Sequence, residues 1–326
     1  MEGCQIFVDA LTQFAEQSRN PRLTPIIRRI AAPIRVAARG RDGVGRTTVA
    51  AALSGAGVVM TPEVADVTVM VVADVLKPED SAAIGSPGGP SLVILNKADL
   101  TGFQAGGPLA LAHRRAATYR ALTGVPVVPM VALLAAVDLD DELAGALQVL
   151  VHAPADLTST DAFVQAEHPL PRQVRRRLLE VLDRFGIAHA VLALADGADA
   201  DAVRSLLRRL SLVDRVVEHV GAAGAQARYR RVRAAVIELR TLAAQSGDES
   251  LADFLATDAV VLAVMAAAVE AVEADGARVD SGDDHETHLR RAVYWRRYGR
   301  GPVGDLHRTC AADISRGSLR LLGRSR

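Results

Sequence analysis

The chain has 326 residues, of which 50% are hydrophobic, and it carries 38 basic and 38 acidic side chains. This length is sufficient for two domains with packed cores. A formal net charge of zero excludes a long-range attraction of the whole molecule to nucleic acid or to acidic membranes. Cys4 and Cys310 lie near opposite ends without metal-ligand spacing, so we expect reduced thiols in a cytoplasmic protein.

Targeting and membrane-spanning patterns are not recognisable in the sequence. The first residues lack the basic segment and apolar core of a secretory signal. The longest apolar run, at 259–269, is shorter than the roughly 20 residues that a membrane-spanning helix requires. We therefore expect a soluble protein.

The first part of the chain predicts a helix followed by a β-α unit. Apolar residues recur at helical spacing over 5–17, and a linker with three prolines follows. Residues 34–38 read as a strand that enters a glycine-rich turn and then a helix.

Strand and helix patterns then alternate along the chain. Further strands are predicted at 57–60, 67–73, 91–95, 126–131 and 188–194. Helices are predicted at 46–55, 106–122, 139–151, 172–184 and 200–210. This alternation predicts an α/β fold with a mostly parallel sheet flanked by helices on both faces.

Beyond about residue 222 the strand patterns stop, and long helices rich in Ala, Arg and Leu follow. We therefore expect a C-terminal α-helical bundle. The predicted organisation is an α/β domain over 34–222, a helical domain over 223–326, and an N-terminal helix within 1–20 that packs on the helical domain.

The turn after the first strand has the spacing of a phosphate-binding loop. Residues 40–47 match the pattern G-x-x-x-x-G-K-T, except that Arg46 occupies the lysine position. Glycines allow successive backbone N–H groups to surround phosphate oxygens, and the following helix adds its positive end. The candidate phosphate-binding residues are Gly40, Gly43, Val44, Gly45, Arg46, Thr47 and Thr48. The hydroxyl of Thr47 is the candidate Mg²⁺ ligand.

A second loop follows the apolar run 91–95 and reads Asn96-Lys97-Ala98-Asp99. The chain contains two lysines against 36 arginines, and one of the two lysines stands in this loop. Composition therefore does not explain the match to an N-K-x-D motif.

With these two motifs, residues 34–135 resemble the translation-factor-related class of P-loop GTPases, particularly its Era-like and dynamin-like members. The resemblance implies that Asp99 accepts hydrogen bonds from guanine, that Asn96 ties its loop to the phosphate loop, and that Lys97 covers the base. It also implies backbone contacts from Val131 and Ala132 to guanine O6, although Val131 replaces the family's serine. The expected ligands are GTP or GDP, with Mg²⁺.

The chain departs from the family where hydrolysis takes place. Met60 and Glu63 replace the Asp and Gly of the D-T-P-G motif, and no threonine-bearing first switch is recognisable. Lys97 follows Arg46 by only 51 positions, which is short for the family. Asp74 is either a substitute metal ligand or the ordinary end of its strand. We therefore predict nucleotide binding with weak or absent hydrolysis.

The resemblance to dynamin-like proteins also implies a role carried by the helices. The expected partners are guanine nucleotide and a related GTPase or another protein, with peripheral contact at the inner face of the membrane; nucleic acid is not expected. Two alternatives stay open, an active small dynamin-like GTPase and a nucleotide-free scaffold.

Two further patterns have simpler explanations. The arginine-rich segment 290–326, with interleaved aromatic residues, is either a surface for acidic lipids or RNA or a solvated helix face, and we favour the helix face. His285 and His288 stand beside Asp283 and Asp284, but their spacing differs from H-E-x-x-H. We expect a loop leading into a helix there, rather than a metal site.

Overall fold

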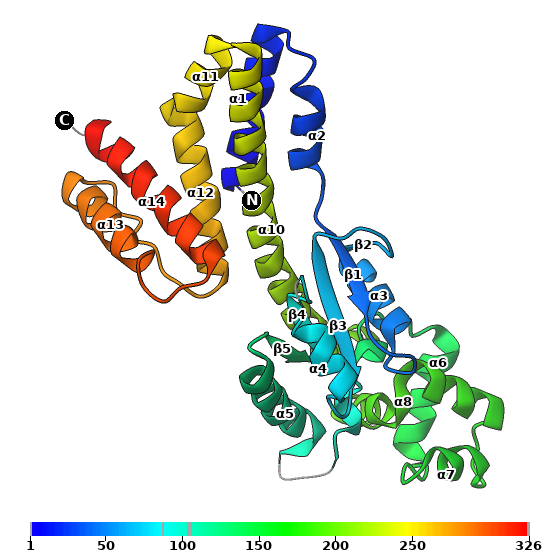
Figure 1. The fold of residues 1–326 in the computed structure, drawn as a ribbon. Helices are drawn as coiled ribbons and strands as arrows, with labels where there is room; N and C mark the ends of the chain where they lie inside the picture. Colours follow the sequence, from blue (N-terminus) through cyan, green and yellow to red (C-terminus); the bar gives the residue numbers. More distant parts are fainter. Residues whose placement is uncertain (1, 87, 103–105, 325–326) are drawn as a thin grey trace. The chain divides into compact units, whose positions relative to one another are not determined.

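The computed structural model describes residues 2–86, 88–102 and 106–324. The chain divides into two compact units (Figure 1). The α/β unit comprises residues 35–220, and the helical unit combines the residues up to 34 with those from 221 onward.

The α/β unit is built on a five-stranded sheet in the order β2-β1-β3-β4-β5, in which every neighbouring pair is parallel. The strands are β1 (Arg35–Arg39), β2 (Val59–Met60), β3 (Val67–Ala73), β4 (Leu92–Asn96) and β5 (Val127–Pro129). β3 and β4 are almost wholly buried, which explains their continuous apolar sequences. The expected α/β class with a parallel sheet is therefore confirmed.

This strand order has a topological switch point between β1 and β3. The order 2-1-3-4-5 is a doubly wound arrangement in which the chain changes direction between β1 and β3. Ligands of such sheets bind at the carboxyl ends of the strands beside this point. The register of the strands brings the carboxyl ends of β1, β3 and β4 close together. Arg39 of β1 pairs with Met70 of β3, and Ala73 of β3 pairs with Asn96 of β4.

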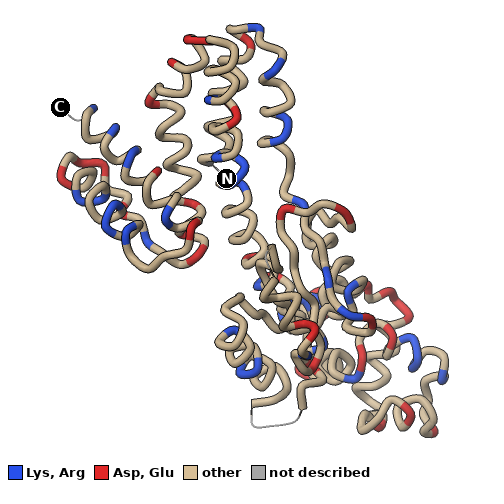
Figure 2. The backbone as a smooth tube through the Cα atoms, viewed as in Figure 1, with Lys and Arg blue, Asp and Glu red and all other residues tan. Residues whose placement is uncertain are grey.

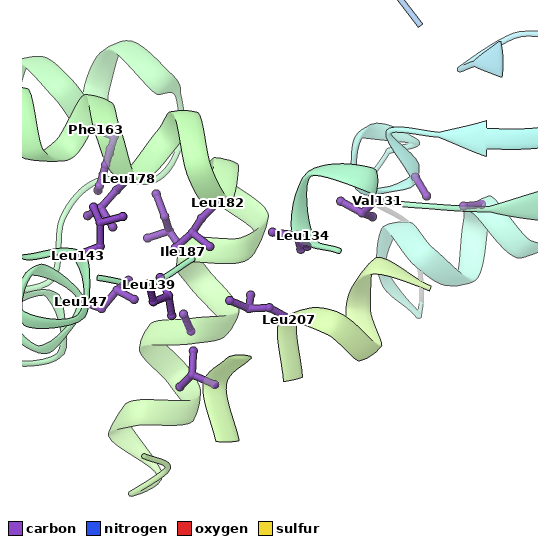
Figure 3. Close-up of a cluster of buried hydrophobic side chains, with 14 of the residues drawn as sticks. Val131, Leu134, Leu139, Leu143, Leu147, Phe163, Leu178, Leu182, Ile187 and Leu207 are labelled. Atoms are coloured by element: carbon purple, nitrogen blue, oxygen red, sulfur yellow. The ribbon is translucent and has the colours of Figure 1, made fainter. Parts of the chain in front are cut away.

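Helices and short 3₁₀ turns complete the α/β unit. They are α3 (Arg46–Gly55), α4 (Pro78–Ile84), η1 (Ala98–Leu100), α5 (Gly107–Thr123), η2 (Ala132–Leu134), α6 (Asp141–His152), α7 (Thr160–Gln165), α8 (Arg172–Ala195) and α9 (Ala200–Ser211). A buried cluster joins η2 to α6, α8 and α9 through Leu134, Leu143, Leu182, Ile187 and Leu207 (Figure 3). The loop after β5 is therefore anchored in the main core of this unit.

The strand predicted at 188–194 is wrong, because these residues belong to α8. A short apolar run does not distinguish a strand from a partly buried helix. Ile187 and Ala190 are buried whereas Leu192 is exposed, as expected for one face of a helix. The predicted linker also contains a helix, α2 (Thr24–Ala31), since a proline is tolerated in a first helical turn.

The helical unit contains both ends of the described chain. Its elements are α1 (Glu2–Ser18), α2, most of α10 (Val213–Ser246), α11 (Glu249–Ala256), α12 (Asp258–Ala274), α13 (His285–Tyr298) and α14 (Asp305–Arg324). One buried cluster joins α1 and α2 to α10, α11 and α12. A second cluster surrounds Trp295 and joins α10, α12, α13 and α14.

The described helices lie within residues 2–86, 88–102 and 106–324. No single helix in these ranges is long and apolar enough to cross a bilayer. α11 and α12 together reach the required length and composition, but they are bent by 52° relative to each other.

The close contact of α1 with α12 predicts how a substitution at Gly3 changes the stability of the helical unit. A Cβ atom at Gly3 would lie 2.2 Å from the backbone nitrogen of Ala267. We therefore expect Gly3→Ala to separate the two helices and to reduce the unfolding free energy of the helical unit by about 1–3 kcal/mol. Urea unfolding followed by Trp295 fluorescence measures this change, because Trp295 is the single tryptophan and is buried in this unit.

The matched control is Gly221→Ala in α10, where an added Cβ meets no atom within 4 Å. Alanine costs less backbone entropy than glycine in a helix, so this variant is expected to gain about 0.5–1 kcal/mol. Equal stability of the two variants would contradict the predicted close packing.

Candidate functional site

The loop after β1 is shaped by glycines. Gly40, Gly43 and Gly45 have φ values of 148°, 81° and 86°. A Cβ at Gly40 would lie 2.3 Å from the carbonyl oxygen of Val71, and one at Gly45 would lie 2.5 Å from Nδ2 of Asn96. A Cβ at Gly43 would meet no atom within 4 Å. The loop is therefore held against β3 and β4 at its two ends and is open at its middle.

α3 starts directly from this loop. Gly45 is its N-cap residue and provides no side-chain hydrogen bond to the first turn. Such a helix start presents backbone N–H groups and the positive end of the helix dipole to an anion. The side chains of Thr47 and Thr48 are exposed in this turn, whereas Val44 is buried beneath the loop. The local geometry is that of an anion-binding turn.

Arg46 occupies the lysine position of the motif and contacts its own loop. Its guanidinium lies 2.6 Å from Oδ1 of Asp42. Asp42 is 98% exposed, so the pair is solvated and contributes little to stability. Arg46 would have to leave Asp42 in order to contact a phosphate.

Asn96 joins three loops at the carboxyl edge of the sheet. Its side chain is 4% exposed, and its Nδ2 donates a hydrogen bond to the carbonyl oxygen of Val44 at 2.9 Å. Its Oδ1 accepts a hydrogen bond from the N–H of Ala132 at 3.2 Å. Nζ of Lys97 donates to the carbonyl oxygen of Gly43 at 2.9 Å. Two motifs about fifty positions apart are thus in direct contact.

Asp99 borders a pocket of about 410 Å³. Gly102, Pro108 and Asp183 of α8 line the same pocket. Burial raises the pKa of Asp99, and the charge of Asp183 raises it further, whereas the charge of Lys97 opposes the shift. The pocket therefore carries negative charge in partly desolvated surroundings.

Phe185 and His189 of α8 form the aromatic part of the same pocket. Their ring centroids are 4.5 Å apart with an interplanar angle of 66°, an edge-to-face arrangement. Burial lowers the pKa of His189, which favours its neutral form. The pocket thus offers flat apolar surfaces together with carboxylate acceptors.

A contact that the sequence analysis missed fixes the start of the phosphate loop. Asp80 of α4 is 2% exposed, and its two carboxylate oxygens each accept a hydrogen bond of 3.0 Å from the guanidinium of Arg41. The backbone N–H of Lys77 also donates to Asp80, at 3.1 Å. The sequence signal is Pro78 followed by Asp80, which marks a helix start with an acidic first turn.

Among the described residues, carboxylate, imidazole and thiol side chains do not gather into a metal site. Thr47 offers one hydroxyl, and Met60 at the end of β2 has no oxygen donor in its side chain. The carboxylate of Asp74 lies 2.7 Å from Arg115, and its carbonyl oxygen accepts a hydrogen bond from Tyr119. Across the residues that the structure describes, no group of three His, Cys, Asp or Glu side chains is arranged for a metal ion. Asp74 attaches α5 to the end of β3 instead.

His285 and His288 lie in the first turn of α13. Asp284 caps α13 by accepting a hydrogen bond from the N–H of Thr287 at 2.9 Å. His288 is buried, and its Nδ1 lies 2.9 Å from the guanidinium of Arg291. These contacts support the predicted loop leading into a helix.

Several arginines of the segment 290–326 are used inside the helical unit, although residues 325 and 326 lie outside the described chain. Arg291 is buried and donates to Ser318, while Arg320 pairs with Asp258 at 3.3 Å. Figure 2 shows basic and acidic residues interspersed along both units. A solvated helix face agrees with Arg290, Arg316 and Arg320, whose side chains are about half exposed, but not with the buried Arg291.

The raised pKa of Asp99 predicts how a variant responds to pH. The carboxyl group of Asp99 holds its proton more tightly in the folded chain than in the unfolded chain. Asp99 therefore favours folding at low pH. That contribution is lost as the pH rises through the folded-state pKa. We therefore expect ligand-free Asp99→Asn to be more stable than the natural chain at pH 7 and to lose this advantage on acidification.

Urea unfolding followed by circular dichroism at several pH values between 4 and 7.5 measures this difference. Trp295 fluorescence reports the helical unit separately and should not change between the two proteins. Asp42→Asn is the matched control, because it removes a fully exposed carboxylate from the neighbouring loop. A pH-independent difference for Asp99→Asn would contradict the prediction.

Comparison with known proteins provides no relative for this chain. No protein-family model matches it, and neither a curated protein nor a solved structure is similar to it. Any functional interpretation therefore depends on the residues and geometry described above.

Proposed function

We propose that this protein binds guanine nucleotides as a degenerate member of the P-loop GTPase class and acts as a regulator or partner subunit through its helical unit. The observation that carries the proposal is the pair of hydrogen bonds from Asn96 and Lys97 to the loop between Gly40 and Thr47. These bonds connect the glycine-rich turn with the loop that also carries Asp99.

The phosphate side of the site fits the proposed ligand. The start of α3 carries no side-chain cap, and the open side of Gly43 leaves room for phosphate oxygens near backbone N–H groups. Thr47 and Thr48 are exposed in the same turn. Binding of phosphate would release Arg46 from Asp42 and provide the positive charge.

The base side of the site supports guanine over adenine. An ionised carboxylate only accepts hydrogen bonds, and Asp99 lines a pocket wide enough for a ring. The Watson–Crick edge of guanine donates from N1 and from its amine, so one carboxylate can accept from both. Adenine has an unprotonated N1, which would face the carboxylate oxygen lone pairs. Two charge-assisted hydrogen bonds to Asp99 would therefore favour guanine over adenine.

Hydrolysis is proposed to be weak or absent. Phosphoryl transfer depends on positioned charges, and removing one such group costs about 10²–10³-fold in rate. Met60 and the exposed Glu63 stand where the family has a metal-linked aspartate and a γ-phosphate glycine. Because the side chains present do not fit a Mg²⁺ site, we derive no catalytic step.

Titration of the full-length protein with fluorescent GDP, GTP and ATP tests the proposal. We expect saturable binding of both guanine nucleotides and weaker binding of ATP. Asp99→Ala should weaken GDP binding about tenfold or more, because each hydrogen bond to a charged group contributes about 1.5–3 kcal/mol. Asp138→Ala, at an exposed carboxylate outside both loops, should bind GDP like the natural chain. Equal affinities for ATP and GTP, or the absence of saturable binding, would reject the proposal.

Phosphate release from GTP in the presence of Mg²⁺ separates this proposal from an active GTPase. We expect release close to the uncatalysed background. Rapid Mg²⁺-dependent release that disappears in Thr47→Ala would instead favour the active enzyme, because it would tie turnover to the exposed hydroxyl in the first turn of α3.

A nucleotide-free scaffold is the second candidate function. The pairing of Arg46 with Asp42 and of Lys97 with the Gly43 carbonyl satisfies the basic groups of the loop without any phosphate. A stable protein partner that co-purifies from native cells, together with failure of the nucleotide titration, would favour this alternative.

A further inference from the structure

α8 is interrupted at Asp183, which has φ 51° and ψ 176°. Residues other than glycine rarely adopt this backbone conformation. The strain of such a conformation persists only where the surrounding structure enforces it. Oδ1 of Asp183 accepts a hydrogen bond of 2.6 Å from the N–H of Arg184. Glycine would adopt this backbone without strain, so the break does not itself require a carboxylate.

The packing of α8 explains why the break is held in this place. Leu182 and Ile187, on either side of it, are buried in the cluster that contains Leu134 of η2 (Figure 3). A Cβ at Gly186 would lie 2.7 Å from Cδ2 of Leu134, so α8 approaches η2 closely. The loop after β5 and the break in α8 are therefore fixed against each other.

Other residues of α8, next to those buried in the cluster, line the pocket beside Asp99. Phe185, Ala188 and His189 are spaced three and four positions apart, so they share one helix face, and all three line the pocket beside Asp99. Asp183 lines the same pocket at the start of this face. Two half-buried carboxylates in one pocket repel each other unless a ligand donates hydrogen bonds to them.

We propose that Asp183 is a specificity-determining residue that accepts a hydrogen bond from the exocyclic amine of guanine, while Asp99 accepts from N1–H and from the other amine hydrogen. This inference rests on the proposed function. The Watson–Crick edge of guanine carries three hydrogens that can be donated, one on N1 and two on the amine. Asp99 accepts two of them, and the carboxylate of Asp183 would accept the third. The rings of Phe185 and His189 line the space that the flat base would occupy.

Hypoxanthine is the ligand that isolates this role, because it keeps N1–H and lacks the amine. Asp99 can still accept from N1–H of hypoxanthine, whereas Asp183 then has no partner. The ratio of affinities for GDP and IDP therefore reports on the amine. A purely structural role of Asp183 would change both affinities together.

Competition binding of GDP and IDP to the full-length protein tests the inference, with the natural chain, Asp183→Asn and Asp183→Gly compared. Asparagine keeps the size of the side chain but loses the charge, and glycine removes the side chain while relieving the backbone. We expect both variants to lower the GDP-to-IDP affinity ratio about tenfold or more, as for one lost charge-assisted hydrogen bond. IDP affinity should change by less than about threefold, since the lost bond concerns an amine that IDP lacks. Asp183→Gly should melt at or above the temperature of the natural chain.

The outcomes separate this inference from the proposed function. If the natural chain binds GDP and both variants keep its GDP-to-IDP ratio, the role of Asp183 is overturned and guanine binding stands. Equal losses of GDP and IDP affinity in both variants also overturn it, because they indicate a structural role. If the natural chain binds neither nucleotide, the proposed function and this inference fail together.

Discussion

The buried side-chain amide of Asn96 holds the functional edge of the α/β unit together. A buried amide that loses a partner costs free energy, so its donor and acceptor must both be satisfied. Asn96 satisfies them with the carbonyl of Val44 and the N–H of Ala132, which belong to the loops after β1 and β5. One side chain reaches both loops because parallel strands bring their carboxyl ends to the same edge.

Most charged groups at this edge have fixed partners within the protein. Arg41 is held by Asp80, Asp74 by Arg115, and Lys97 lies on the carbonyl of Gly43. Such contacts stabilise the loops and satisfy these charged groups within the protein. Asp99 and Asp183 differ, because they share a pocket in which like charges meet.

The helical unit is assembled from two separate parts of the sequence. α1 and α2 contribute Phe7, Leu11 and Ile30 to a core that residues from α10, α11 and α12 complete. An amphipathic helix of moderate length is marginal alone and gains its stability by burying its apolar face. The α/β unit is thus inserted between two parts of one helical core, and α10 continues from one unit into the other.

The sequence by itself determined the elements whose patterns are local. β3 spans the predicted residues 67–73, and α3 spans the predicted 46–55, because continuous apolar runs and a glycine turn before a helix have few alternatives. The contact of Asn96 with the loop after β1 was implied by the resemblance of the two motifs to the GTPase class, and its hydrogen bond to Val44 agrees with it.

Only the tertiary structure decided the features that depend on distant partners. Residues 188–194 form the end of α8, whose Gly186 lies close to Leu134 of η2, and the run itself is compatible with either state. The contact of Arg41 with Asp80 joins positions 39 apart, and no local pattern identifies Asp183 as a neighbour of Asp99. These features arise from side chains that meet only in the folded chain, so no short stretch of sequence identifies them.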